Sequence, residues 1–226
     1  MRGPALCHPE NLAGQDILSV AVVFACGVLL GILQQAGREV SSLQIPAGKS
    51  VQIEGPFNPA EWRDSATASV RVDPSWTVRI LVKHDAANLY LAFERLERGG
   101  RRLYPEVMID PELKGGSRWS HEQFWFHISN NLCEGQGVFS VYEQNGVFQC
   151  GHTKAGWAGT NPPQGREPVR VRISFEKIGL DQPRGKKIGL ALDVTDASGE
   201  ANQLFRYWPR NADIRHPSSW GIAEIN

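Results

Sequence analysis

The stretch of sequence that decides the fold reads Val78-Arg79-Ile80-Leu81-Val82-Lys83-His84-Asp85 and then Asn88-Leu89-Tyr90-Leu91-Ala92-Phe93-Glu94. Both halves are rich in β-branched, aromatic and other apolar residues, which favour strands. Between them, residues 85–88 read Asp-Ala-Ala-Asn, and Asp and Asn are typical turn residues. The stretch therefore predicts a β-hairpin with one buried face.

The rest of the chain after Val51 is divided in the same way into short β-rich segments separated by turn residues. The segment from Val169 to Phe175 alternates apolar and polar residues, which is typical of a strand with one face on a core and one in water. Helical spacing is scarce, apart from a turn from Pro59 to Arg63 that Asn58 could cap. The sequence thus predicts an all-β fold, a two-sheet antiparallel β-sandwich of immunoglobulin or jelly-roll type. The expected strands are Ala68–Val72, Val78–Lys83, Leu89–Glu94, Glu106–Ile109, Gln123–Ser129, Gly137–Tyr142, Val147–Cys150, Val169–Phe175, Ile188–Val194, Leu204–Tyr207 and Gly221–Ile225.

Composition limits the classes of function. The chain has 226 residues, of which 41% are hydrophobic and 21% charged, so it is long and apolar enough to bury one sizeable core. Lys and Arg total 24 and Asp and Glu total 24, so there is no excess of basic residues of the kind that nucleic-acid-binding domains carry. We therefore expect a single folded domain and no nucleic-acid partner.

The N-terminal region differs from the rest of the chain. Residues 17–33 are apolar except for Ser19 and two glycines, and no charge interrupts them. This length lies between the core of a signal peptide, about 7–15 residues, and a membrane-spanning helix of about 20. The sequence therefore predicts a hydrophobic targeting helix within residues 1–36, either a cleaved signal peptide or a signal anchor that holds the protein at the membrane. A linker over residues 37–50 and an extracytoplasmic domain over residues 51–226 follow from this reading.

Two cysteines flank a predicted hairpin. Cys133 precedes the expected strand Gly137–Tyr142, and Cys150 ends the strand after it. Disulfides persist in the oxidising compartment that the targeting segment implies. A Cys133–Cys150 disulfide is one expectation; the alternative is two buried thiols that act as small apolar side chains.

Several motifs, in this order and spacing, resemble family 9 carbohydrate-binding modules and the wider group of DOMON-like sandwiches. The resemblance covers residues 51–226 and implies a non-catalytic domain that binds poly- or oligosaccharides. The motifs that carry it are Gly55 with Ala60-Glu61-Trp62, the 78–85 and 88–93 strands, Glu106-Val107-Met108-Ile109-Asp110-Pro111 and Pro217-Ser218-Ser219-Trp220-Gly221.

The resemblance fails at the positions that would hold the sugar. Modules of this family bind a pyranose between two tryptophans. The matching positions in this chain are near Gly100 and at Ile214. Neither residue offers the flat ring that stacks on a sugar face. An aromatic platform is therefore expected elsewhere in the chain.

Tryptophans in loops are the first candidates for that platform, because binding residues concentrate in loops. Trp157, in a glycine-rich segment, is the leading candidate and Trp119 the second. Rim residues of the sandwich supply the lesser candidates, which are Tyr104, Arg101 and Trp208. The other tryptophans of the family-like motifs, Trp62, Trp125 and Trp220, are expected in the core.

The resemblance also implies two cofactors that the domain could bind. Structural calcium is one, and Asp110 with Glu112 would supply part of its oxygen ligands. Some DOMON-like sandwiches hold a b-type haem for electron transfer, and here Met108 with His127 or His121 would be the axial pair.

Enzymatic signatures are thin. The chain has no Gly-x-Ser-x-Gly elbow, no His-Glu-x-x-His pair and no Cys-x-x-Cys. We therefore predict a non-catalytic, carbohydrate-binding module that could accompany glycan breakdown. The alternatives are a structural or protein-contact domain of the cell envelope and a haem-binding domain.

Overall fold

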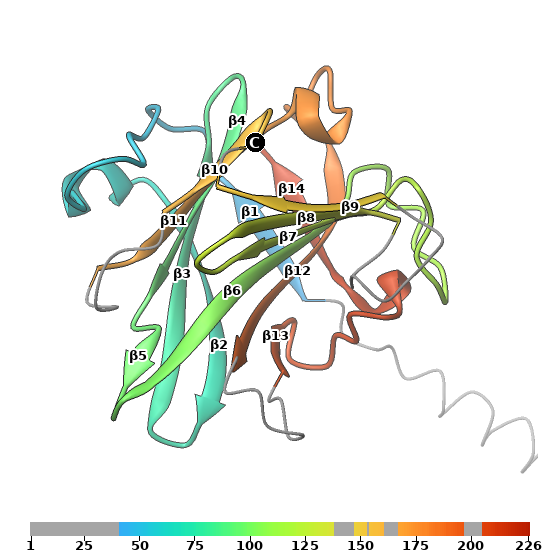
Figure 1. Cartoon of the computed structure of the whole chain (residues 1–226). Helices are drawn as coiled ribbons and strands as arrows, with labels where there is room; N and C mark the ends of the chain where they lie inside the picture. The colour runs from blue at the N-terminus through green and yellow to red at the C-terminus, as the bar shows by residue number, and fades with distance from the viewer. Residues whose placement is uncertain (1–40, 138–146, 153, 161–166, 197–204) are drawn as a thin grey trace, which may run out of the picture. The chain divides into compact units, whose positions relative to one another are not determined.

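Two β-sheets pack face to face around one core in the computed structural model (Figure 1). The structure describes residues 41–137, 147–152, 154–160, 167–196 and 205–226. The predicted targeting segment lies outside these residues. Among the residues that the structure does describe, no helix has the length and apolar character needed to cross a membrane.

The smaller sheet contains the hairpin that the sequence predicted. β3 and β4 pair antiparallel with Val82 opposite Leu91, and Asp85 closes their turn by accepting hydrogen bonds from the backbone N–H groups of Ala87 and Asn88 at 2.8 and 2.7 Å. In spatial order the strands are β10 (Trp157–Gly159), β11 (Val169–Ser174), β4 (Asn88–Glu94), β3 (Trp76–His84) and β2 (Ala66–Asp73).

The larger sheet is antiparallel except at one edge, where β1 runs parallel to β14. Its main path is β1 (Ser42–Ile45), β14 (Gly221–Ile225), β12 (Lys187–Asp196), β6 (Arg101–Asp110), β7 (Phe124–Ile128), β8 (Leu132–Gln136) and β9 (Val147–Gly151). Off this path, β13 (Phe205–Trp208) pairs with β12 and β5 (Glu97–Arg98) pairs with β6. Within the described residues, helix is confined to short 3-10 turns, η1 (Pro59–Trp62), η3 (Glu176–Ile178) and η4 (Pro217–Ser219).

The core lies between the inner faces of the two sheets. Val82 and Leu91 of the smaller sheet and Ile109, Phe126 and Leu190 of the larger one are all completely buried there. Each lies on the inward-facing side of its strand, because successive side chains of a strand point to opposite faces. The predicted all-β sandwich is therefore confirmed.

Three details of the sequence-based prediction are corrected. β1 lies within residues 37–50, which we expected to be a linker, so the sheet begins before Val51. β9 pairs with β8 (Leu132–Gln136), a strand that the sequence did not predict. Gly137 has a φ of +73°, a left-handed conformation that ends β8, and residues 138–142 lie outside the described part of the chain.

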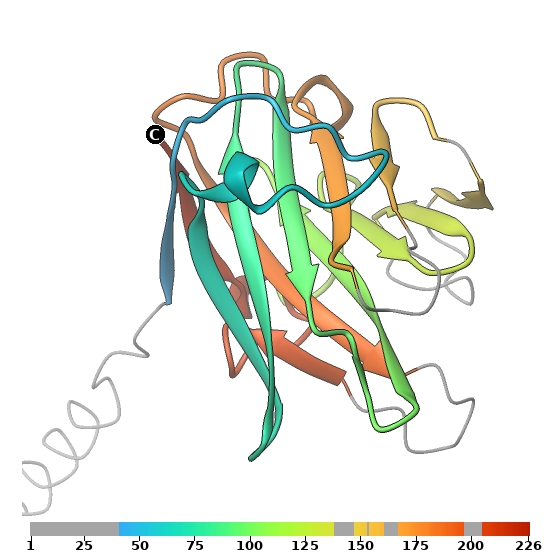
Figure 2. The same cartoon turned by 90° about the vertical axis from the view of Figure 1, so that its left-hand side faces the viewer.

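The outer face of the smaller sheet is covered by the chain itself. Figure 2 shows the segment between β1 and β2 crossing the front of β3 and β4. Val51, Ile53 and Trp62 of this segment pack on Leu81 and Tyr90 of the sheet. We expected this face of the sheet to lie in water, but a strand face is polar only where nothing covers it.

The covering segment also supplies hydrogen-bond acceptors to two buried cations. Lys83 is fully buried, and its Nζ donates to the Glu61 carbonyl at 2.8 Å and to Asp64 Oδ1 at 2.6 Å. Arg170 is 3% exposed and donates to the carbonyl oxygens of the segment, including that of Gly55. A buried charge needs such partners, so these contacts fix the segment on the sheet.

Candidate functional site

The outer face of the larger sheet carries the most unusual chemistry in the described residues. Glu106 of β6 stands between Asp193 of β12 and His127 of β7 in the strand register. His127 is followed by Cys133 of β8 and Cys150 of β9, which are joined by a disulfide. One row across five strands thus brings together two carboxyls, an imidazole and a disulfide.

The two carboxyls form a buried acidic pair. Asp193 has no exposed surface and Glu106 is 5% exposed. Burial, and then the charge of Glu106, raise the pKa of Asp193 well above its usual range. Asp193 Oδ1 accepts a hydrogen bond of 2.9 Å from the backbone N–H of Arg206, and Glu106 Oε1 lies 2.8 Å from His127 Nδ1. Burial beside Glu106 therefore favours the neutral form of Asp193, next to a carboxyl that contacts His127.

Aromatic rings form a continuous lane beside this pair. Along the lane, Tyr104 lies 6.3 Å from His127, His127 lies 5.6 Å from Trp125, and Trp125 lies 5.5 Å from Phe148, measured between ring centroids. Trp125 is stacked on both of its neighbours. The strand register sets Gly135 between Trp125 and Phe148, so no side chain separates the two rings. We call Tyr104, His127, Trp125 and Phe148 the aromatic lane.

Three buried polar atoms at this face have no hydrogen-bond partner among the residues that the structure describes. They are Trp125 Nε1, Asp193 Oδ2 and Thr195 Oγ1. A buried polar group left unsatisfied costs about 1–3 kcal/mol, and such groups usually mark positions where water or a ligand binds. Asp193 and Thr195 lie on β12 and Trp125 lies on β7, on the same face of the sheet with β6 between them, so this face is the candidate binding site.

Trp157, the leading candidate from sequence, is not available as a platform. It lies in strand β10, is 2% exposed and packs edge to face on Phe126. Its Nε1 donates a hydrogen bond of 2.7 Å to Glu134 Oε2. The prediction that Trp157 stacks on a sugar is therefore wrong, because the residue belongs to the core.

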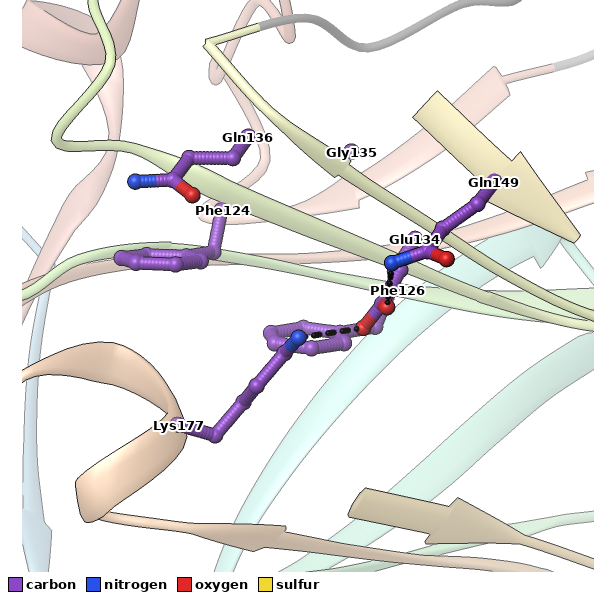
Figure 3. A pocket seen from close by; sticks show the side chains of 7 residues that line it. All are labelled: Phe124, Phe126, Glu134, Gly135, Gln136, Gln149 and Lys177. Atoms are coloured by element: carbon purple, nitrogen blue, oxygen red, sulfur yellow. Dashed lines mark hydrogen bonds and ion pairs between the residues drawn. The ribbon is translucent and has the colours of Figure 1, made fainter. Parts of the chain in front are cut away.

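Glu134 lies in a small pocket at the open edge of the sandwich. Figure 3 shows Lys177 and Gln149 converging on its carboxylate, at 2.9 and 2.6 Å. Phe124 and Phe126 also line this pocket, which has a volume of about 40 Å³. Sites for small molecules usually occupy about 300–1,000 Å³, so this pocket is too small for a sugar ring.

Two other predicted site residues lie away from the outer face. Arg101 and Leu103 share the inner side of β6, and the Arg101 guanidinium pairs with Asp196 at 2.6 Å at one end of the sandwich. Trp208 pairs with Leu192 in the strand register and packs against the main core. The structure therefore separates both residues from Tyr104.

Tyr104 and Trp119 do lie on the outer face. The Tyr104 ring also contacts the Arg102 guanidinium, whose carbon lies 5.5 Å from the ring centroid. Trp119 donates from Nε1 to the Ile214 carbonyl at 2.6 Å and packs edge to face on Trp220. Trp119 thus brings an aromatic ring to the neighbourhood of Ile214, one of the two positions where the family's stacking tryptophans are missing.

Sequence reasoning missed most of the site. Trp125 was expected in the core, and it is indeed 6% exposed, but it packs in a separate cluster on the outer face. Phe148 was not considered, and Glu106 was noted only as part of a motif. The spacing of Trp125 and His127, two residues apart on one strand, is the signal that could have joined them.

The expected cofactors do not fit the residues present. Asp110 accepts hydrogen bonds from the backbone of Lys114 and Gly115 and from the side chain of Gln123, and Glu112 pairs with Lys114 at 2.9 Å. In the described part of the chain, no three acidic, histidine or cysteine side chains gather as metal ligands. N–H donors thus take the oxygens that calcium would need.

Haem ligation is also poorly served. Met108 and His127 project from the same face of adjacent strands, whereas axial ligands must approach the iron from opposite sides. The Glu106 carboxylate already engages His127 Nδ1, and His121 lies in an exposed turn. We derive no chemistry from either group.

Comparison with known proteins supports the fold. The described residues define a β-sandwich, antiparallel except where β1 pairs with β14, with aromatic and acidic side chains on the outer face of the larger sheet. The chain is similar to a family 9 carbohydrate-binding module from Caldicellulosiruptor kristjanssonii in complex with cellotriose, with 13% identity and a TM-score of 0.55 over 82% of this chain and 94% of that one. The same kind of module in complex with glucose gives 12% identity and a TM-score of 0.54 over 82% and 96%.

At this level of identity the likeness concerns the fold alone, so the chain has a sandwich of the kind seen in family 9 modules. No protein-family model matches the sequence, and no match is found among curated proteins.

Proposed function

We propose that this protein is a non-catalytic, extracytoplasmic module that binds a carbohydrate on the outer face of its larger sheet. The observation that carries the proposal is the aromatic lane beside a buried acidic pair with unsatisfied polar atoms. Aromatic rings stack on the apolar face of a pyranose, and carboxyl and indole N–H groups bond to its hydroxyls. The similar modules were solved with cellotriose and glucose, which supports a sugar ligand.

The chemistry of the acidic pair suits hydroxyl recognition. A neutral Asp193 can donate a hydrogen bond through its O–H, while Glu106 accepts one, so the pair offers both polarities to a sugar. Trp125 Nε1 adds a second donor. The role proposed for the pair is to bind a glycan, without bond cleavage.

Titration calorimetry of the full chain with cellotriose and glucose tests this proposal. We expect binding that Phe148→Ala and Tyr104→Ala each weaken roughly threefold to tenfold, because one stacked ring contributes about 0.5–1.5 kcal/mol. Phe57→Ala is the matched control, because Phe57 is also half-buried but lies on the covered face of the smaller sheet. Equal weakening by Phe57→Ala would rule out the lane as the site.

The acidic pair provides a second test of the proposed site. Glu106→Gln should weaken binding, while Glu94→Gln, which alters an exposed ion pair with Arg79 on the other sheet, should not.

The same purified protein distinguishes the two alternative functions. An absorption spectrum tests haem binding, which would give a Soret band. Absence of binding to any oligosaccharide would favour a structural or protein-contact domain of the cell envelope.

A further inference from the structure

A groove with a strongly basic lining runs between β2 of the smaller sheet and β13 of the larger one. The two strands lie side by side at one edge of the sandwich (Figure 1), and Arg206 Nε donates to the Val72 carbonyl across the gap at 3.3 Å. The groove has a volume of about 680 Å³, within the range of sites for small molecules. Its lining residues are Ser69, Arg71, Val72, Asp73, Pro74, Arg206, Tyr207 and Arg210.

Three arginines and one aspartate line this groove. Arg71 and Arg210 are exposed, and neither forms an ion pair with a carboxylate of the described residues. Asp73, the single acid, turns toward the β2–β3 turn, where its Oδ1 accepts hydrogen bonds from the backbone N–H and hydroxyl of Ser75 at 2.7 and 2.8 Å. The groove therefore presents an excess of positive charge to any ligand.

Two arginines on the outer face of the smaller sheet, Arg79 and Arg71, differ in whether they pair with a carboxylate. Arg79, on the same outer face of the sheet as Arg71, makes a two-point contact with Glu94 at 2.5 and 2.9 Å. Arg71 lies on the adjacent strand β2 and has no such partner among the residues that the structure describes. A guanidinium is a planar fork of N–H donors that matches a carboxylate or a sulfate, so an unpaired arginine in a groove is suited to an anion.

The groove adjoins the candidate sugar site. Tyr207 lines the groove and also packs against the cluster of Met108 and Trp125 on the outer face. The backbone N–H of Arg206 donates to Asp193 Oδ1 of the acidic pair. A ligand that extends from the aromatic lane past Asp193 would therefore reach the arginines next.

We propose that the groove binds the anionic group of an acidic glycan, a uronate carboxylate or a sulfate ester, while a neighbouring sugar lies on the aromatic lane. The inference rests on the proposed function and narrows it from carbohydrate in general to charged carbohydrate. Arg71 and Arg210 would bind the anion through their guanidinium groups, and the Ser69 hydroxyl would add a hydrogen bond. Because the groove is open to solvent, salt should weaken this part of the binding.

Calorimetry of the full chain with three trisaccharide-sized probes tests the inference. The probes are cellotriose, trigalacturonate and a sulfated carrageenan oligosaccharide, which separate a neutral sugar, a carboxylate and a sulfate. We expect one or both acidic probes to bind at least fivefold more tightly than cellotriose in low salt. Arg71→Ala and Arg210→Ala should each remove roughly threefold to tenfold of that affinity, with little effect on cellotriose.

Arg184→Ala is the matched control. Arg184 is an exposed arginine in the turn before β12, whereas β13 and the groove lie beside the C-terminal half of β12. Its removal changes the net charge equally and should leave all affinities unchanged. Thermal melting of the variants checks that each is folded.

The possible failures are distinguishable. Equal affinity for cellotriose and the acidic probes would overturn the basic groove and leave the proposed function standing. Tighter binding of acidic probes that Arg184→Ala weakens as much as Arg71→Ala would also overturn it, since general charge attraction would then explain the preference. Failure of all three probes to bind would overturn the proposed function together with this inference.

Discussion

The two outer faces of the sandwich differ in how their buried charged groups are paired. On the smaller sheet, the segment between β1 and β2 covers the strands, and the buried ammonium of Lys83 has acceptors at Glu61 and Asp64. On the larger sheet, Asp193 Oδ2 and Trp125 Nε1 are buried without partners in the described part of the chain. Since Arg170 Nε of the first face is also buried without a partner among the described residues, the contrast lies in the charges: Asp64 neutralises Lys83 on the first face, whereas Asp193 on the second face lies beside another carboxyl, Glu106.

The largest expected effect concerns the disulfide at the edge of the binding face. Replacing both Cys133 and Cys150 by Ala should lower the free energy of unfolding by about 3 kcal/mol, because the bond closes a loop of 17 residues in the unfolded chain. Sugar binding should weaken as well, since the edge strand β9 carries Phe148. Denaturant unfolding and calorimetry measure the two effects.

Reduction of the unaltered protein is the control for that double variant. Cys150 is exposed, so dithiothreitol can reach the bond. The reduced protein should lose a similar amount of stability without any change of side chain. A loss below about 1 kcal/mol in both cases would show that the strand pairing of β8 and β9, and not the disulfide, holds this edge of the site.

Sequence predicted the elements that local chemistry specifies. The β3–β4 hairpin was predictable because its turn is closed by Asp85, within three residues of the groups that it binds. Burial of a residue by segments distant in sequence was not predictable. Trp157 is core because Glu134, 23 residues earlier, accepts its N–H. Arg170 is covered because Gly55, 115 residues away, lies over it.

The same limit explains the site. The residues Glu106, His127 and Asp193 are far apart in sequence, and only the pairing of β7, β6 and β12 brings them into one row. Alternation along a single strand indicates which residues share a face, but it does not indicate which strands are neighbours. Predicting the aromatic lane would have required the register of four strands, β6 to β9.

The second largest expected effect is a loss of stability at the covered outer face of the smaller sheet. Asp64→Ala should lower the free energy of unfolding by about 2 kcal/mol, because it leaves the fully buried Lys83 without its counter-ion. The figure is set below that of a fully buried pair, since the Asp64 side chain is 43% exposed. Glu94→Ala, which breaks an exposed ion pair on the same sheet, is the control and should cost under about 1 kcal/mol. Equal losses would mean that the segment is not held by Lys83.

The smallest effect, on the order of 1 kcal/mol, separates the two faces by the sign of their pH dependence. Burial alone would raise the pKa of Asp64, but the hydrogen bond and charge of Lys83 outweigh it and hold that pKa below its usual range. The contribution of Asp64 to stability is therefore present above about pH 4, the unfolded value, and is lost as pH falls through the lower folded value.

Asp193 behaves in the opposite sense. Since burial and the charge of Glu106 raise its folded pKa, its contribution is complete below about pH 4 and is lost as pH rises through the folded value. Asp193→Asn keeps the shape and the Oδ1 acceptor for the Arg206 N–H, but it does not ionise. The variant should therefore lose less stability than the unaltered protein between pH 5 and 8, measured as melting temperature against pH. Parallel curves for the two proteins would show that Asp193 is ionised in the folded state, in which case a bound cation or an ordered hydrogen-bond donor, rather than a proton, must offset its charge beside Glu106.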